Sequence, residues 1–242
     1  MIKFDILHLY CLNFHDITLP GITFKENGNT TYNKDAKNAL ITYIGETALT
    51  ISNDLKNVNS ISNLKVESES MYMITFMTSD VTKLYKDFSK KGIKCTQPTY
   101  DMKKNALKIP CKTKFKYMTF KPLKDLNLTF CFREIDTSSD LLDYQKAMTP
   151  NSAKSDITGV KEIKIYGTFT KQDFEVLTQI FDTSYISEGE FSAEIYDNQT
   201  LTFITSETSK VEIQLEVRGK VFKGKEINIL DSKNASPLVI LY

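Results

Sequence analysis

The same order of predicted elements occurs twice along the chain, and this repeat restricts the fold more than any other feature of the sequence. The first copy begins with an alternating β-rich run from Met71 that ends at Ser79 and Asp80, two residue types favoured at helix N-caps. A helix is predicted next, because apolar residues recur at helical spacing before Gly92: Val81, Leu84, Tyr85 and Phe88. Three short segments rich in β-branched or aromatic residues complete a β-α-β-β-β unit: Ile93 to Pro98, Lys116 to Lys121 and Leu128 to Ile135.

The second copy follows a polar linker at residues 137–159. Val160 to Thr168 alternates as a strand, and Thr170 with Asp173 resembles a capping box at the start of an amphipathic helix. Three strands are predicted after this helix: Phe191 to Tyr196, Thr200 to Thr205 and Val211 to Arg218. Residues 160–242 therefore read as another β-α-β-β-β unit.

The N-terminal 53 residues contain the strands of such a unit without its helix. Phe4 to Leu12 and Gly21 to Glu26 are predicted strands, and Asn38 to Ile44 with Glu46 to Ser52 predicts a hairpin. Only eight residues separate Leu12 from Gly21, fewer than the ~10 that an ordinary helix needs. We therefore predict an α+β protein of three βαβββ modules. A degenerate module (1–53) and a complete one (71–135) form a domain of residues 1–136, and the third module covers residues 160–242.

Charge and composition exclude several functions. The chain has 31 Lys and Arg against 30 Asp and Glu, so no strong field attracts nucleic acid or anionic lipid. Arg133 and Arg218 are the only arginines, and His8 and His15 are the only histidines. Such a chain cannot build a histidine-rich metal site. P-loop, G-x-G-x-x-G, H-E-x-x-H and G-x-S-x-G motifs are absent from the sequence.

The N-terminus and the cysteines predict a cytoplasmic protein that does not enter the membrane. Lys3, Asp5 and His8 interrupt what would have to be the apolar core of a signal peptide. No apolar run approaches the roughly 18 residues of a membrane span. The four cysteines form no C-x-x-C pair, which favours reduced thiols.

Four segments, in their order along the chain, resemble the vicinal oxygen chelate superfamily, and within it the glyoxalase-like domain proteins: FDILHL, KNALITYIGETALTIS, ITFMTSDVTKLYKDFSKKGIKC and TPNSAKSDITGVKEIKI. The resemblance covers most of the chain. It implies that two modules pair into a sheet that curls around a substrate cleft. Many members of the superfamily hold a divalent metal there, through His, Gln or Glu from the first and last strands of each module.

The resemblance can be carried over position by position. It places the two metal-ligand positions of the first module on His8 and Thr50. In the second module it places them on Met73 and on Arg133 or, with a slip of one residue, Glu134. Only His8 and Glu134 are usual metal ligands, whereas a catalytic metal normally keeps three protein ligands. We therefore expect no cofactor, with a divalent metal held by other ligands as the alternative.

His8 has two interpretations. As a catalytic residue it would exchange a proton with Glu134, whereas the simpler alternative is a strand histidine hydrogen-bonded inside a half-buried sheet. The residues expected to contact substrate in the cleft are Tyr10, Asn38, Thr50, Met73 and Phe132.

The resemblance, with the metal-ligand positions only partly kept, implies a glyoxalase-like protein that binds a small organic metabolite between the first two modules, without a catalytic metal. One alternative is a metal-dependent lyase, isomerase or dioxygenase of the same superfamily, and another is a non-catalytic structural or partner-binding protein. The third module would expose an apolar sheet face: Ile163, Ile165, Phe203 and Leu215. Such a face favours association, so we predict a homodimer or, failing that, packing of the third module on the first two.

Overall fold

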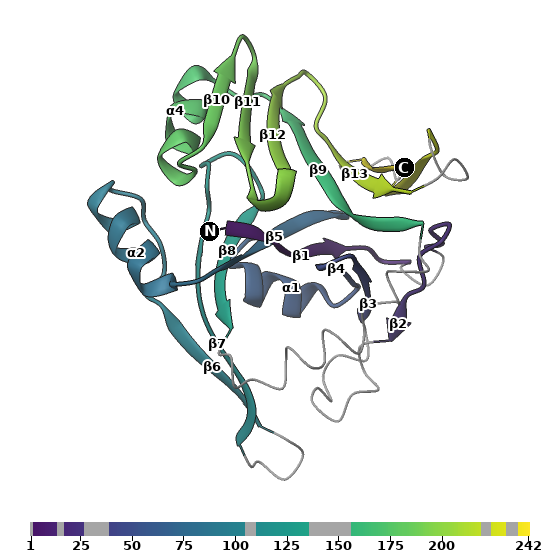
Figure 1. Ribbon diagram of the computed structural model, residues 1–242, viewed down its shortest axis with the longest axis horizontal. Helices are drawn as coiled ribbons and strands as arrows, with labels where there is room; N and C mark the ends of the chain where they lie inside the picture. The colour runs from purple at the N-terminus through teal and green to yellow at the C-terminus, as the bar shows by residue number, and fades with distance from the viewer. Residues whose placement is uncertain are drawn as a thin grey trace.

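The computed structural model describes residues 2–13, 17–26, 39–104, 110–135, 156–218, 224–230 and 237–242. These residues form two mixed β-sheets with a few short helices (Figure 1), which confirms the predicted α+β class. Among them, no helix is long and apolar enough to cross a membrane.

The first sheet has eight strands in the described part of the chain: β1 (Ile2–Tyr10), β2 (Lys25–Glu26), β3 (Ala39–Ile44), β4 (Thr47–Ser52), β5 (Ser70–Thr78), β6 (Thr99–Lys104), β7 (Pro110–Phe120) and β8 (Thr129–Ile135). Their order is β2-β3-β4-β1-β5-β8-β7-β6. In each half the first strand lies parallel to the last, β1 beside β4 and β5 beside β8. The halves meet where β1 pairs antiparallel with β5, so the centre of the sheet is made by the first strand of each half.

The helices of the first sheet differ from the prediction in one respect. Helix α2 (Val81–Lys90) begins at Asp80, whose side chain accepts a hydrogen bond from the backbone N–H of Lys83, as the sequence predicted. The described residues between β1 and β2 contain no helix. An unpredicted helix, α1 (Leu55–Ser62), follows β4 and is capped by Asp54. The predicted strand at Ile93 to Pro98 is wrong: this stretch forms no strand, although the backbone N–H of Thr96 donates to the Thr119 carbonyl at 2.9 Å, and β6 begins only at Thr99.

The second sheet has seven strands within the described residues: β9 (Ile157–Gly167), β10 (Ser184–Ser187), β11 (Glu190–Glu194), β12 (Thr200–Thr205), β13 (Lys210–Val217), β14 (Glu226–Leu230) and β15 (Leu238–Leu241). Helix α4 (Lys171–Ile180) follows β9, and the capping box of Thr170 and Asp173 forms with both of its hydrogen bonds. A single turn of 3₁₀-helix, η3 (Tyr196–Asn198), joins β11 to β12.

Strand β13 does not have the role that the sequence predicted. It pairs antiparallel with β9 and parallel with β15, whereas β12 is the parallel neighbour of β9. The complete unit is therefore β9-α4-β10-β11-β12, and β13 to β15 form a fourth, shorter unit. Strand β10 was missed because its sequence, SYIS, is short and lies at the sheet edge with no buried side chain.

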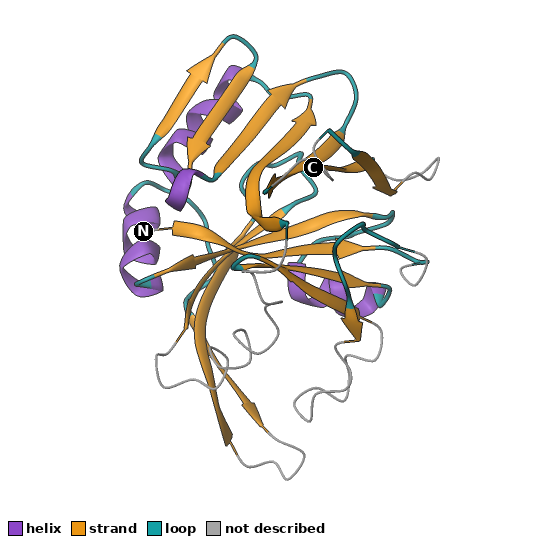
Figure 2. Cartoon of the chain, turned by 45° about the vertical axis from the view of Figure 1, so that its right-hand side comes forward, coloured by secondary structure: helices purple, strands orange, loops and turns teal. Residues whose placement is uncertain are grey.

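The two sheets lie next to each other (Figure 2), and one hydrophobic core joins them. Phe76 of the first sheet lies 5.8 Å from Phe181, and Phe130 lies 6.5 Å from Phe203 of the second sheet, measured between ring centroids. The apolar face that was expected to lack a partner in the chain belongs to this core: Ile163, Ile165, Phe203 and Leu215. The first sheet and helix α4 cover that face, so the homodimer stays a prediction that has lost this support.

Candidate functional site

The first sheet has two chemically different faces. Leu7 and Leu9 of β1 point into the shared core, whereas His8 and Tyr10 point to the opposite side. We call this side the His8 face and define it by residues of four neighbouring strands: Asp5, Ile6, His8, Tyr10, Thr50, Tyr72, Met73, Thr75, Cys131 and Arg133. Helix α1 covers part of it, because Val58 packs in one cluster with Tyr10, Tyr72 and Met73.

A β-bulge brings Asp5 to this face. Phe4 pairs with Phe76 and Ile6 pairs with Thr75, so Asp5 is an extra residue with no partner on β5. An extra residue in one strand reverses the alternation of side chains on either side of it. Asp5 and Ile6 can therefore both lie on the His8 face, although they are adjacent in sequence.

His8 is held between two threonine hydroxyls. Its Nδ1 lies 3.0 Å from Thr50 Oγ1, and its Nε2 lies 3.0 Å from Thr75 Oγ1. Thr50 Oγ1 donates its proton to the carbonyl oxygen of Leu7 at 3.3 Å, so it is available to His8 only as an acceptor. We assign the proton of His8 to Nδ1, which leaves Nε2 to accept from Thr75.

The surroundings of His8 keep it neutral. Burial and, to a smaller extent, the positive charge of Arg133 together lower the pKa of His8 from 6.5 to about 3. A general base works best when its pKa is close to the working pH. His8 at neutral pH is therefore a hydrogen-bonding group, which agrees with the simpler of its two interpretations.

Asp5 and Arg133 form a buried ion pair on the same face. Arg133 Nε donates to Asp5 Oδ2 at 2.6 Å, and Arg133 Nη2 lies 2.5 Å from the same oxygen. The side chains are 0% and 8% exposed. Among the described residues, Asp5 Oδ1 has no hydrogen-bond partner, and Arg133 Nη2 has only this ion-pair contact with Asp5 Oδ2. The guanidinium also lies 5.4 Å from the ring centre of Phe115.

The structure brings together some of the predicted site residues and separates others. His8, Tyr10, Thr50 and Met73 share the His8 face, whereas Asn38 lies outside the described residues. Phe132 is buried in the shared core, with its ring centroid 5.0 Å from that of Phe76.

Glu134 lies on the far side of the sheet from His8. Its Oε2 accepts a hydrogen bond of 3.0 Å from the backbone N–H of Val81, at the start of α2. Successive residues of a strand face opposite sides, so Arg133, and not Glu134, shares a face with His8. The predicted proton exchange between His8 and Glu134 is therefore wrong. Asp5, Thr75 and Cys131 were missed; the alternation of β8 was a signal for Cys131, but the bulge at Asp5 has no signature in the sequence.

The donors on the His8 face do not suit a divalent metal. Both nitrogens of His8 are hydrogen-bonded, and burial raises the pKa of the Cys131 thiol to about 12, so it stays protonated. The Asp5 carboxylate is bound to Arg133, whose own positive charge would repel a cation. In the described part of the chain, no three His, Cys, Asp or Glu side chains come together.

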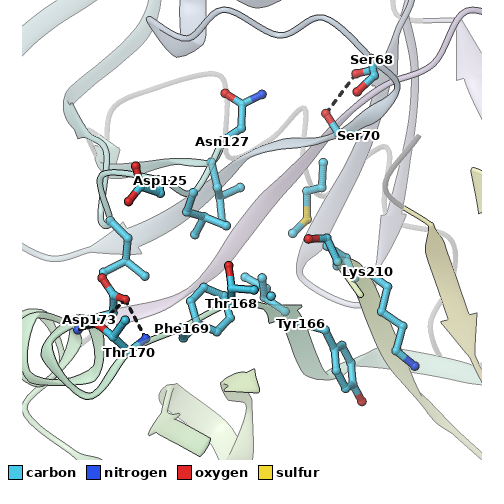
Figure 3. A pocket seen from close by; sticks show the side chains of 18 residues that line it. Ser68, Ser70, Asp125, Asn127, Tyr166, Thr168, Phe169, Thr170, Asp173 and Lys210 are labelled. Carbon is cyan, nitrogen blue, oxygen red and sulfur yellow. Dashed lines mark hydrogen bonds between the residues drawn. The ribbon is translucent and has the colours of Figure 1, made fainter. Parts of the chain in front are cut away.

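A cavity of about 360 Å³ lies between the two sheets (Figure 3). The first half of the chain contributes the start of β5 and the loop between β7 and β8, including Asp125 and Asn127. The second half contributes the end of β9, the loop to α4 and the start of β13, including Phe169 and Lys210. The predicted site residues that the structure describes do not line this cavity.

Comparison with known proteins identifies the fold. No protein-family model matches the chain, and a search of curated proteins finds no relative. A solved structure of a hypothetical protein from Staphylococcus aureus is 12% identical, covers 99% of both chains and has a TM-score of 0.67.

Two dioxygenases share the fold at still lower identity. An E323L variant of homoprotocatechuate 2,3-dioxygenase from Brevibacterium fuscum is 9% identical over 99% of this chain and 71% of that chain, with a TM-score of 0.51. The 2,3-dioxygenase LapB from Pseudomonas sp. KL28 is 8% identical over 98% of this chain and 91% of that chain, also with a TM-score of 0.51. At these identities the likeness concerns the fold alone. The chain has the vicinal oxygen chelate fold that the sequence resemblance predicted.

Proposed function

We propose that the protein binds a small organic molecule at the His8 face and needs no divalent metal to do so. The observation that carries the proposal concerns two buried atoms: within the described residues Asp5 Oδ1 accepts no hydrogen bond, and Arg133 Nη2 has only its ion-pair contact with Asp5 Oδ2. Buried polar atoms are hydrogen-bonded in the great majority of cases, so a bound molecule is expected to complete this pair. Because Nη2 donates and Oδ1 accepts, that molecule carries a carbonyl or carboxylate oxygen near a hydroxyl group.

Arg133 supplies the positive charge of this site. A guanidinium stays protonated at any physiological pH and recognises carboxylates through a fixed, planar set of donors. The bond from Nε to Asp5 and the contact with Phe115 fix its orientation. Neutral His8 adds polarity without charge. Asp5 balances the charge of Arg133, so this combination supports recognition of an oxygen-rich molecule, such as a hydroxy or keto acid, through directed hydrogen bonds more than acid–base catalysis.

Isothermal titration with α-hydroxy acids, α-keto acids and neutral diols, with and without chelator, tests the proposal. We expect at least one hydroxy or keto acid to bind equally well with chelator, and Arg133→Lys to weaken this binding about tenfold or more, because the planar donor set is lost. Glu134→Gln is the matched control, since it changes the neighbouring residue on the opposite face and should leave the affinity unchanged.

His8→Gln provides a second measurement in case Arg133→Lys does not fold, and it should also weaken binding. The proposal is wrong if no acid binds, if binding requires a metal, or if Arg133→Lys and His8→Gln both bind the acid as the unmodified protein does.

A further inference from the structure

The cavity between the sheets has an apolar wall that a ligand body can contact. Its buried lining comes from both halves of the chain: Met71, Leu123, Leu128, Ile165 and Val211. Phe169 is half-buried beside them, and its ring is fixed by an edge-to-face contact of 5.4 Å with Phe203. Concave sites of roughly 300–1,000 Å³ with a mainly apolar lining and a few polar groups are typical of small-molecule sites, often at domain interfaces.

Several polar side chains around the cavity already have partners within the protein. Tyr166 donates to Glu212 at 2.8 Å, and Lys210 donates to the same carboxylate at 2.6 Å. Asp173 accepts from the backbone N–H and the hydroxyl of Thr170 in the capping box of α4. These groups stabilise the fold around the cavity and are not free to change partners without loss.

Of the three charged residues that line the cavity, Asp125 is the one whose side chain has no partner among the described residues. It is exposed and, within the described residues, its carboxylate forms no ion pair or hydrogen bond. Figure 3 shows Asp125 and Asn127 on one side of the cavity and Thr168 and Phe169 on the other. The charge of Lys210 is balanced by Glu212, so the uncompensated charge of the cavity is negative.

We propose that this cavity is a second binding site, for a small molecule with an aromatic or aliphatic body and a protonated amine. The body lies against Phe169 and the apolar wall, and the amine pairs with Asp125. Neither this charge nor this wall belongs to the His8 face, so the site is independent of the acid-binding site proposed above. Because the lining comes from both sheets, bound ligand also stabilises the packing of the two halves.

Three probes of one shape test the site and its charge preference: benzylamine, benzyl alcohol and benzoate, titrated into the full-length protein by ligand-observed NMR. Exposed ion pairs contribute about 0.2–1 kcal/mol, so we expect benzylamine to bind up to about fivefold more tightly than benzyl alcohol, and benzoate to bind least. Asp125→Asn should remove the difference between amine and alcohol. Asp182→Asn, which changes an exposed aspartate that does not line the cavity, is the matched control and should leave it unchanged.

A substitution at the rim separates this cavity from other surfaces. Thr168 is exposed and lines the cavity, so Thr168→Trp should fold normally, fill the entrance and weaken amine and alcohol alike by tenfold or more. The proposal is overturned if benzylamine binds no better than benzyl alcohol or benzoate, or if Thr168→Trp leaves all three affinities unchanged.

Discussion

Removing one partner of the Asp5–Arg133 pair should destabilise the protein strongly. The Nε and Nη2 atoms of Arg133 both lie within 2.6 Å of Asp5 Oδ2. In Asp5→Asn the guanidinium therefore faces a neutral amide in place of the carboxylate. Because the two side chains are at most 8% exposed, water cannot replace the lost carboxylate. Loss of one member of a buried pair costs about 3–5 kcal/mol, against a total stability of about 5–15 kcal/mol for a typical protein.

Urea unfolding followed by far-UV circular dichroism measures this loss. The matched comparison is a double-mutant cycle of Asp5→Leu, Arg133→Met and the two combined, in which the double variant leaves no buried charge. We expect each single variant to lose about 3 kcal/mol or more, and the double variant to lose much less than the sum, because apolar replacements of buried pairs are often neutral. Single losses below about 1 kcal/mol, or additive losses, would show that the pair is not buried and coupled as described.

Three further predictions concern His8, Glu134 and Gly45. The pKa of His8 is about 3 in the folded protein and 6.5 in the unfolded chain, so below pH 6.5 the unfolded chain binds a proton that the folded protein does not. The free energy of unfolding should therefore be unaffected by His8 above pH 6.5 and fall by up to about 1.4 kcal/mol per pH unit between pH 6 and 4. Urea titrations of His8→Gln should show a weaker dependence on pH over this range. Glu134→Gln removes a negative charge from the N-terminus of α2 and should lower the free energy of unfolding by about 0.3–1 kcal/mol. A loss of ligand affinity in this variant would contradict the placement of Glu134 on the side of the sheet away from His8. Gly45 has φ +61°, and an added Cβ would lie 2.3 Å from the Thr158 carbonyl oxygen. Gly45→Ala should therefore lower the free energy of unfolding by about 1–3 kcal/mol. An unchanged urea midpoint would refute the close approach of Gly45 to Thr158.

The elements with strong local signals were predicted well. The apolar spacing from Val81 to Phe88 produces α2, and the capping box of Thr170 and Asp173 starts α4. Strand β12 covers Thr200–Thr205, the range that alternation indicated. These features depend only on residues close together in the sequence, so the local sequence pattern is enough to predict them.

Strand partners were harder to predict, because pairing depends on residues far apart in the chain. Strand β13 has the same alternation whether it extends a third module or begins a fourth, and only its antiparallel pairing with β9 decides between them. The apolar face with Ile163 and Phe203 could likewise be predicted from the sequence. That the first sheet covers this face could not be predicted. An exposed-face argument for association is therefore weak wherever a chain contains a second sheet.

The candidate site depends on irregularities at the centre of the first sheet. Strands β1 and β5 each contain one extra residue, Asp5 in β1 and Tyr72 in β5, because the register shifts on either side of them. Both side chains lie on the His8 face: Asp5 meets Arg133, and the Tyr72 ring lies 5.8 Å from that of His8. In a regular pairing, Asp5 would share the face of Leu7 and Leu9 and lie in the apolar core. The two bulges thus place a carboxylate and a phenol on the His8 face, which is why alternation alone predicted His8 and Thr50 but not the ion pair of Asp5 and Arg133.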